Sequence, residues 1–157
     1  MNVFDSYTHE LLLTLNKEQV EYLVVGGYAV NYHGYRRTTG DIDLWIKPEN
    51  GENKERILRS LHRLKVSESK LKQLKALDFT KHVVFIDGEE PFKIDFMTQV
   101  SGVNFDDAWK QKIIANIDDL NIPFLHLSDL IVSKITTGRN KDKIDIEELQ
   151  KIQMRKK

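Results

Sequence analysis

Hydrophobic and polar residues alternate along the chain in a way that predicts short helices between short strands. Residues 4–16 carry hydrophobic side chains at helical spacing and predict an amphipathic helix. The apolar run 22–25 predicts a strand, which ends at Gly26 and Gly27. A short helix over 28–33 follows and closes at the next glycine. The N-terminal part therefore predicts the order helix, strand, glycine turn, helix.

The segment 41–46 has the period of a half-buried strand. Ile42 and Leu44 alternate with Asp41 and Asp43. Side chains two residues apart on a strand share a face and lie about 7 Å apart. If Ile42 and Leu44 face the core, both carboxylates face the opposite side of the sheet.

The rest of the chain predicts a hairpin and further helices. A second amphipathic helix runs over 57–64, and the lysine-bearing stretch 67–78 is irregular or a short helix. Strands over 82–86 and 91–97 flank the loop 87–90, which has hairpin chemistry. The remaining expectations are an ambiguous helix or strand over 109–117, an extended segment over 121–127, a helix over 129–137 capped by Ser128 and closed by Gly138, and a last helix over 142–152.

Length and composition indicate one globular α+β domain over residues 1–157, a small mixed sheet with helices packed on it. Its core is expected over about 20–100, with a C-terminal extension over about 104–153. Basic and acidic residues balance at 24 each, so no global charge favours nucleic acid or a membrane. The absence of cysteine excludes a disulfide scaffold and a thiolate nucleophile. We see no signal peptide or apolar membrane span, and we expect a cytoplasmic protein.

Three carboxylates are the strongest candidates for chemistry. Asp41 and Asp43 repel each other unless a cation lies between them. Asp95 lies between Ile94 and Phe96 on a second predicted strand, so it faces away from the core. If the two strands are neighbours, the three acids form the outline of a two-metal site. The alternative is that an Asp-x-Asp pair on an exposed strand is simply solvated.

The glycine pair has two interpretations. Without side chains, Gly26 and Gly27 let a phosphate approach the backbone at the start of a helix, where N–H groups are free. A tight turn alone would need the same residues. An anion cradle close in sequence to paired carboxylates favours phosphoryl transfer.

These residues carry a resemblance. The segment GGYAVNYHGYRRTTGDIDLWI, together with the later FKIDF, resembles the polymerase-beta-type nucleotidyltransferase superfamily. The order Arg37-x-Thr39-x-Asp41-x-Asp43, with 133–134 and 138–145, is similar to the branch that contains abortive-infection nucleotidyltransferase toxins. Small antibiotic nucleotidyltransferases, including those that act on lincosamides, are the nearest alternative. The resemblance spans about residues 20–150, and family members are often longer.

The resemblance implies roles for the central motif. Asp41 and Asp43 would ligate two Mg²⁺ ions, with Mn²⁺ as an alternative. Asp95 would ligate one of them and help to deprotonate the acceptor hydroxyl. Gly26 and Gly27 would hold the triphosphate of the NTP.

It also implies secondary roles outside that motif. Lys134 would neutralise nucleotide phosphates, although a cation in the last turn of a helix also balances the dipole. Asp142 and Asp145 match the family's acidic pair, although Asp142 also has the chemistry of an N-cap. Arg37 and Thr39 would touch phosphate or fix the loop before Asp41.

The expected function is Mg²⁺-dependent transfer of a nucleoside monophosphate from an NTP, such as ATP, to an acceptor hydroxyl or phosphate, with release of pyrophosphate. RNA, a protein and a small molecule all stay open as acceptors. One setting is a toxin with an antitoxin partner, and another is modification of a lincosamide or aminoglycoside. A catalytically inactive nucleotide-binding module and a self-associating subunit are the further alternatives.

Overall fold

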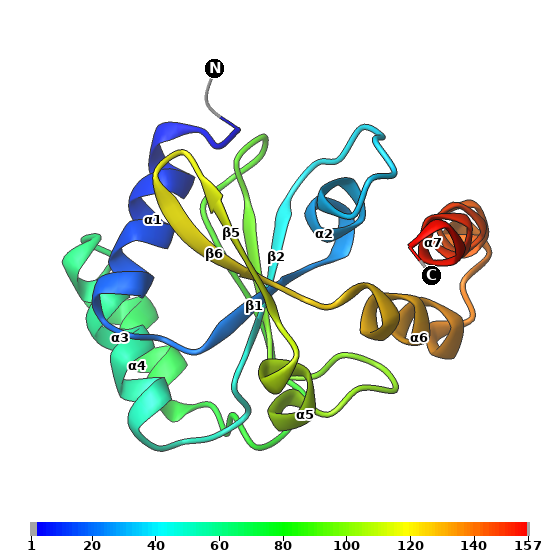
Figure 1. Ribbon diagram of the computed structural model, residues 1–157. Helices are drawn as coiled ribbons and strands as arrows, with labels where there is room; N and C mark the ends of the chain where they lie inside the picture. The colour runs from blue at the N-terminus through cyan, green and yellow to red at the C-terminus, as the bar shows by residue number, and fades with distance from the viewer. Residues whose placement is uncertain (1–2, 157) are drawn as a thin grey trace.

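A six-stranded mixed sheet forms the centre of the protein in the computed structural model, which describes residues 3–156 (Figure 1). The strands lie in the order β3-β4-β2-β1-β6-β5, and the pairs β2–β4 and β1–β6 are parallel. This arrangement confirms the predicted mixed α+β class. The strands are β1 (Tyr22–Val25), β2 (Ile42–Ile46), β3 (Val84–Asp87), β4 (Ile94–Met97), β5 (Ile113–Ile117) and β6 (Leu120–Phe124).

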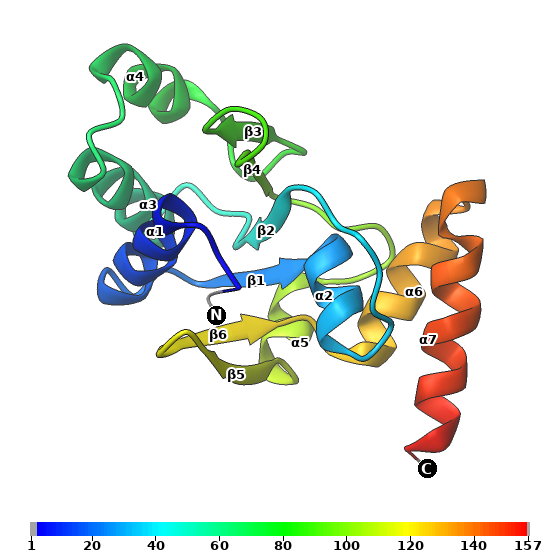
Figure 2. The same cartoon turned by 90° about the horizontal axis from the view of Figure 1, so that it is seen from above.

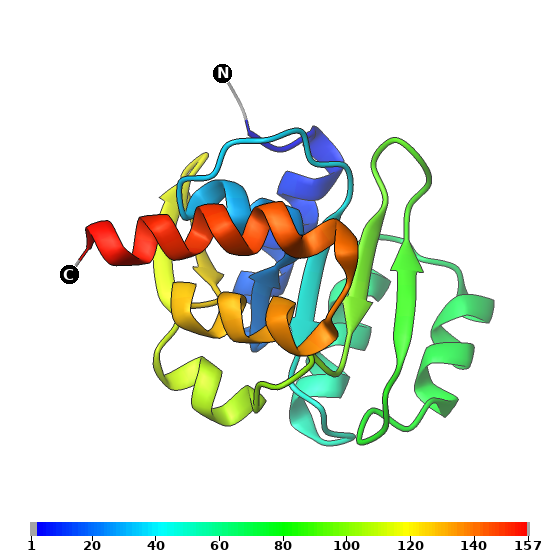
Figure 3. The same cartoon turned by 90° about the vertical axis from the view of Figure 1, so that its right-hand side faces the viewer.

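Helices cover both faces of the sheet. In Figures 1 and 2, α1, α3 and α4 lie on one side, and α2, α6 and α7 lie on the other. Figure 3 shows α6 and α7 in front of the central strands, while the β3–β4 hairpin extends beyond them. The helices are α1 (Ser6–Lys17), α2 (Gly26–Tyr32), α3 (Glu52–Arg63), α4 (Glu68–Ala76), α5 (Phe105–Lys110), α6 (Leu127–Thr137) and α7 (Lys143–Arg155), with a 3-10 turn, η1 (Asn140–Asp142), before α7.

Several predicted elements agree with the structure. The predicted strands at 22–25 and 41–46 correspond to β1 and β2, and the hairpin is β3–β4. Gly138 ends α6 in the left-handed conformation, as expected for a helix C-terminus. The lysine-bearing stretch is helix α4, because the Ser67 side chain caps its first turn by accepting from Lys70 N–H.

Other boundaries were wrong or incomplete. The helix predicted from Asp129 begins at Leu127, and His126 caps it instead of Ser128, because the imidazole Nδ1 accepts from the Ser128 backbone N–H. The ambiguous segment 109–117 divides into the end of α5 and all of β5. Gly26 and Gly27 form the first residues of α2 itself rather than a turn before it.

The core lies mainly between the sheet and the α1–α3–α4 layer. Ile94 and Phe96 are fully buried, as predicted, and Phe96 stacks on Phe85. On the other face, Trp45 is buried against Phe105 of α5, and α2 packs on β1 and β2. No helix within residues 3–156 has the length and apolar character needed to cross a membrane.

The α1 interface gives a direct test of this packing. Leu12 is fully buried, whereas the adjacent Leu13 is half-buried. Leu12→Ala should lower the free energy of unfolding by about 2–5 kcal/mol, because it leaves a cavity under the helix. Leu13→Ala, the matched control, should cost clearly less. Urea denaturation measures both, and equal losses would contradict the assigned helix face.

Candidate active site

Strand register brings two of the predicted acids together. The parallel pairing of β2 and β4 sets Asp43 directly opposite Asp95. Their neighbours Ile42 and Ile94 are buried on the other face of the sheet, so both carboxylates point toward the α2–α6 side. Asp41 precedes β2 and lies at the same end of the strand pair.

The two glycines make room for this arrangement. Gly26 has a φ of +65°, a conformation that disfavours other residues, and a Cβ there would overlap the Asp43 carboxylate. A Cβ at Gly27 would overlap the Thr39 hydroxyl. The start of α2 therefore packs directly on Asp43 and on the loop that leads to Asp41. In Figure 2, β1 leads straight into α2 at this point.

The electrostatics of the acid pair are unfavourable without a cation. The pKa of Asp43 is raised from its ordinary value of 3.8 to about 6, mostly by burial and then by the charge and hydrogen bond of Asp95 and the charge of Asp41. The Oδ1 atoms of Asp41 and Asp95 are buried without a hydrogen-bond partner. Such orphaned acceptors are costly.

One lysine partly offsets this charge. Lys93 Nζ lies 3.3 Å from Asp41 Oδ2 and 3.7 Å from Asp95 Oδ1. Its hydrogen bond to Asp41 and the charge of Asp95 raise the pKa of Lys93. Sequence reasoning missed this residue, although its position two residues before Asp95 on the same strand face was a usable signal.

The donor set fits a hard divalent cation. Within the described part of the chain, no three His, Cys, Asp or Glu side chains are already arranged as a metal-binding group. Asp41, Asp43 and Asp95 nevertheless supply only carboxylate oxygens, the ligands that Mg²⁺ prefers. The two unpartnered oxygens and the raised pKa of Asp43 are the features that a bound cation would relieve.

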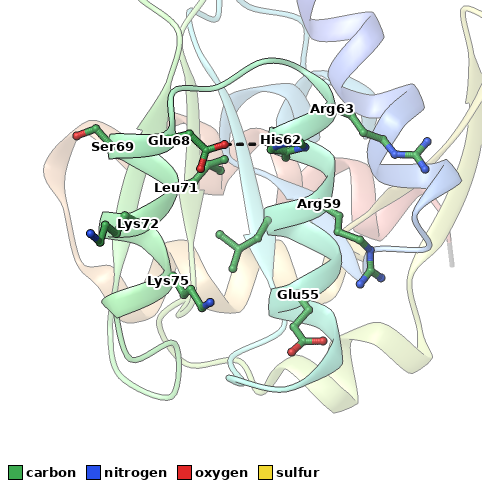
Figure 4. Close-up of a pocket in the computed structure, with 10 residues that line it drawn as sticks. Glu55, Arg59, His62, Arg63, Glu68, Ser69, Leu71, Lys72 and Lys75 are labelled. Carbon is green, nitrogen blue, oxygen red and sulfur yellow. Dashed lines mark ion pairs between the residues drawn. The ribbon is translucent and has the colours of Figure 1, made fainter.

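A cleft of about 290 Å³ opens beside Asp43, between the sheet and α6. Gly26, Lys134 and Arg139 line it together with Asp43. A larger cavity of about 880 Å³ lies between α3 and α4, where His62 and Glu68 approach to 3.6 Å (Figure 4). That cavity contains none of the predicted site residues. We therefore place the candidate site at the smaller cleft.

Buried ion pairs attach the C-terminal helix to this cleft. Lys134 Nζ lies 2.9 Å from Asp142 Oδ1 and 3.0 Å from Asp145 Oδ2, and all three side chains are at least nine-tenths buried. Arg37 donates from Nε and Nη2 to the two oxygens of Asp145, at 2.8 and 2.9 Å. Arg139 Nε lies 2.7 Å from Asp142 Oδ2. We call these five residues the C-terminal clamp.

The clamp changes how two predicted residues are interpreted. Asp142 occupies the N-cap position of α7, as expected, but its side chain makes no cap hydrogen bond. Burial acts to raise the pKa of Asp142, but the hydrogen bonds from Lys134 and Arg139 outweigh it and lower that pKa. Asp142 and Asp145 therefore bind cationic side chains and lie apart from the Asp43–Asp95 pair.

Two hydrogen bonds fix the segment between α2 and β2. His33 is buried, and its Nε2 lies 2.7 Å from the Leu125 carbonyl oxygen, which agrees with the structural hydrogen-bonding role of most lone histidines. The backbone N–H of Arg37 donates to Asn31 Oδ1 at 2.7 Å. The first contact holds the start of the 33–41 loop, and the second holds its middle, two residues before Thr39.

The raised pKa of Asp43 predicts a pH-dependent stability in metal-free protein. Between 3.8 and about 6, the folded state keeps a proton that the unfolded state has lost, so stability falls as pH rises. Asp43→Asn removes this penalty and should be more stable than wild type by about 1–3 kcal/mol at neutral pH. Denaturant curves in a chelator over this range measure the difference. Glu89→Gln, an exposed control, should keep the wild-type slope; the same slope in Asp43→Asn would contradict the assignment.

The clamp predicts a large stability effect on α7. Asp145→Asn removes one charge that faces both Arg37 and Lys134, and it should cost about 3 kcal/mol, because it leaves Lys134 buried with one acid. Glu147→Gln, an exposed control on the same helix, should stay within about 0.5 kcal/mol of wild type. Thermal and urea denaturation give both values. A neutral Asp145→Asn would show that these ion pairs do not hold α7.

Comparison with known proteins agrees with this fold. A candidate nucleotidyltransferase from Thermotoga maritima is 15% identical, with a TM-score of 0.58 over 93% of this chain and 91% of that one. The lincosamide antibiotic adenylyltransferase LnuA, solved with lincomycin bound, is 16% identical, with a TM-score of 0.51 over 97% of this chain and 99% of that one. No protein among the curated ones matches.

The family assignment comes from the sequence as a whole. A family model described as "Nucleotidyltransferase of unknown function (DUF6036)" matches residues 4–154, nearly the whole chain. The match confirms the resemblance that the glycine pair and the Asp-x-Asp motif indicate. The protein belongs to this family and is a member of the nucleotidyltransferase class of enzymes.

Proposed function

We propose that this protein transfers a nucleoside monophosphate from an NTP to an acceptor hydroxyl or phosphate, with pyrophosphate as the second product. The observation that carries the proposal is the Asp43–Asp95 pair, packed on Gly26 at the mouth of a cleft. Two carboxylates that repel each other at such close range are typical of a site that binds a cation.

Asp41, Asp43 and Asp95 are the residues that would hold Mg²⁺. The ion supplies charge neutralisation for the phosphates and lowers the pKa of a bound hydroxyl. Lys93 keeps Asp41 and Asp95 near each other in the metal-free protein. In this proposal Asp95 would also accept the proton of the acceptor hydroxyl.

The phosphates of the NTP would lie over Gly26 and Gly27. Gly26 lines the cleft beside Asp43, and the missing side chains of both glycines let the start of α2 pack against Asp43 and Thr39. Lys134 and Arg139 line the same cleft, and Arg139 keeps half of its side chain exposed. Two lysine–acid contacts already neutralise Lys134, so we assign the main electrostatic contact to Arg139 and the fixing of the cleft wall to Lys134.

Arg37 and Thr39 fix the loop before Asp41. Thr39 packs on Gly27, and Arg37 is held by Asp145. Because in-line transfer tolerates little error in position, the loop that presents Asp41 must be rigid. Arg37, Thr39 and Asp145 therefore act as positioning residues in this proposal.

A small-molecule acceptor is the narrower proposal. It is favoured by the likeness to the lincosamide antibiotic adenylyltransferase LnuA, which covers 97% of this chain and 99% of that one. An RNA or protein acceptor, an antitoxin partner, self-association, a cytoplasmic location and the use of ATP stay predictions. So does the alternative of a catalytically inactive module that binds nucleotide without turnover.

Calorimetric titration with each of the four NTPs and Mg²⁺ tests the proposal without an acceptor. Wild type should bind at least one NTP in a metal-dependent way, and Asp43→Asn should weaken that binding by about tenfold or more while staying folded. Glu89→Gln is the matched control and should bind as wild type does. Metal-independent binding, or equal binding by Asp43→Asn, would overturn the assigned role of the acid pair.

A further inference from the structure

The larger cavity, of about 880 Å³ between α3 and α4, takes no part in the proposed function. Leu58 of α3 and Leu71 of α4 are half-buried and give it an apolar lining. At one end the loop 64–67 joins the two helices, and His62 lies 3.6 Å from Glu68 (Figure 4). We call this cavity the α3–α4 groove. Within residues 3–156 no segment fills it, so its lining is available to another molecule.

Two lysines give the α4 side of the groove unpaired positive charge. Lys72 and Lys75 line the groove and are exposed, and in the described part of the chain neither forms an ion pair. Lys75 points toward α3 in Figure 4. The acids of the lining are Glu55 and Glu68, and Glu68 is the one that faces His62. The two lysines are therefore the free charges on this side.

The α3 side of the groove is basic as well. Arg59 Nε lies 3.2 Å from Glu18 Oε2, and Arg63 Nε lies 2.9 Å from Glu18 Oε1. One carboxylate thus serves two guanidinium groups. With two lysines, two arginines and two glutamates, the lining has a net formal charge of +2 when His62 is neutral. An apolar groove with basic sides favours an occupant that is both apolar and acidic.

The loop of the β3–β4 hairpin has this complementary chemistry. The Phe92 backbone N–H donates to the Glu89 carbonyl oxygen at 2.9 Å, which closes a turn over residues 89–92. Phe92 is 56% exposed, and Glu89 and Glu90 are exposed beside it. Glu90 lies 3.7 Å from Lys93, but a pair with so exposed an acid is weak and leaves the carboxylate available. We call residues 89–92 the hairpin tip.

The hairpin tip has no such partner in its own chain. The Tyr7 hydroxyl donates to Asp87 Oδ2 at 2.6 Å, and Lys70 Nζ lies 3.8 Å from Asp87 Oδ1, so the base of the loop is fixed to α1 and α4. Within residues 3–156, no ion pair or side-chain hydrogen bond joins the tip to the α3–α4 groove. Figure 3 shows the loop beyond the ends of β3 and β4, away from α6 and α7. The tip can therefore enter a groove on another molecule.

The tip and the groove also agree in size and order. The groove volume lies within the range of about 300–1,000 Å³ that is typical of cavities that bury a ligand, so it can hold a phenyl ring and its neighbours. Aromatic side chains in such pockets are common anchors of protein interfaces. A turn that is already closed by its own hydrogen bond loses little conformational entropy on binding.

We infer that the α3–α4 groove binds the hairpin tip of a second copy of this protein. Phe92 inserts between Leu58 and Leu71, and the two glutamates of the tip lie beside the two lysines of α4. In a dimer with two-fold symmetry, each copy gives its tip and receives the tip of the other, so the contact forms twice. This interface lies outside the Asp43 cleft, and the inference does not depend on the proposed function.

Sedimentation velocity of the full chain tests the inference. Wild type should form dimers at about 100 μM and dissociate on dilution to about 1 μM, as expected for an interface with a small apolar centre. Circular dichroism checks that each variant is folded. Wild type that stays monomeric at about 500 μM would overturn the inference.

The aromatic anchor has a matched control. Phe92→Ser should weaken dimer formation about tenfold or more, because it removes the ring that fills the groove. Ile114→Ser should change it less than about twofold, since Ile114 is 52% exposed on β5 at the opposite edge of the sheet. Equal effects of the two substitutions would refute the assigned anchor.

Charge reversal tests both sides of the contact. The groove variant Lys72→Glu/Lys75→Glu and the tip variant Glu89→Lys/Glu90→Lys should each be monomeric at about 100 μM, because like charges then face each other. An equimolar mixture of the two variants should associate again, because each groove then meets a tip of opposite charge. A mixture that stays monomeric, or single variants that still dimerise, would contradict the assigned contact.

A second double reversal separates this contact from an effect of net charge. Lys141 and Lys143 are exposed near the start of α7, and Lys141→Glu/Lys143→Glu should dimerise as wild type does. Loss of dimers in this variant would refute a specific role for the groove. If wild type is monomeric and a short single-stranded RNA binds it but not the groove variant, the groove is a nucleic-acid site and the inference is wrong. These measurements need no NTP or Mg²⁺, so they leave the test of the proposed function separate.

Discussion

The parallel pairing of β2 with β4 is the constraint on which the rest of this site depends. It sets Asp43 against Asp95 on a partly buried face and leaves carboxylate oxygens without partners. A folded protein tolerates such a contact only where the surrounding packing fixes it. Here the buried Ile42, Ile94 and Phe96 on the other face of the same strands hold the register. The core therefore stabilises an arrangement that is electrostatically unfavourable in itself.

The charges of the C-terminal clamp, unlike those of the Asp43–Asp95 pair, stabilise one another. In the C-terminal clamp, Asp142 and Asp145 are satisfied by Lys134, Arg37 and Arg139, so each buried acid has basic partners. This network joins α6, α7 and the loop before β2, and it fixes the wall of the cleft opposite the sheet. The molecule thus contains two acidic clusters of different kinds. One is paired and structural, and the other lacks partners beyond Lys93 and faces the cleft.

Local patterns predicted the central part of the fold well. Alternation over 41–46 and the apolar neighbours of Asp95 were enough to orient all three acids, since strand period depends on sequence alone. The sequence did not show that β2 and β4 are neighbours, because the pairing of strands far apart in the chain depends on tertiary packing. The ion pairs of the clamp were not predicted. The expectation for Asp142 considered only its place at the start of a helix, whereas the turn at Gly138 brings Lys134 and Arg139 to its side chain. Strand period could have placed Lys93 on the face of Asp95, but its contact with Asp41 depends on the pairing of β2 with β4.

The central claim is that Asp43 and Asp95 form an acid pair that requires a cation. Its most direct test is the free energy of unfolding at neutral pH, measured with and without Mg²⁺ in wild type and in Asp43→Asn. The account predicts that Mg²⁺ stabilises wild type, because the ion binds the folded state and relieves the repulsion, and that Asp43→Asn shows little or none of this gain. If Mg²⁺ has no effect on wild type, or stabilises both proteins equally, the acid pair is not a metal site and the account is contradicted.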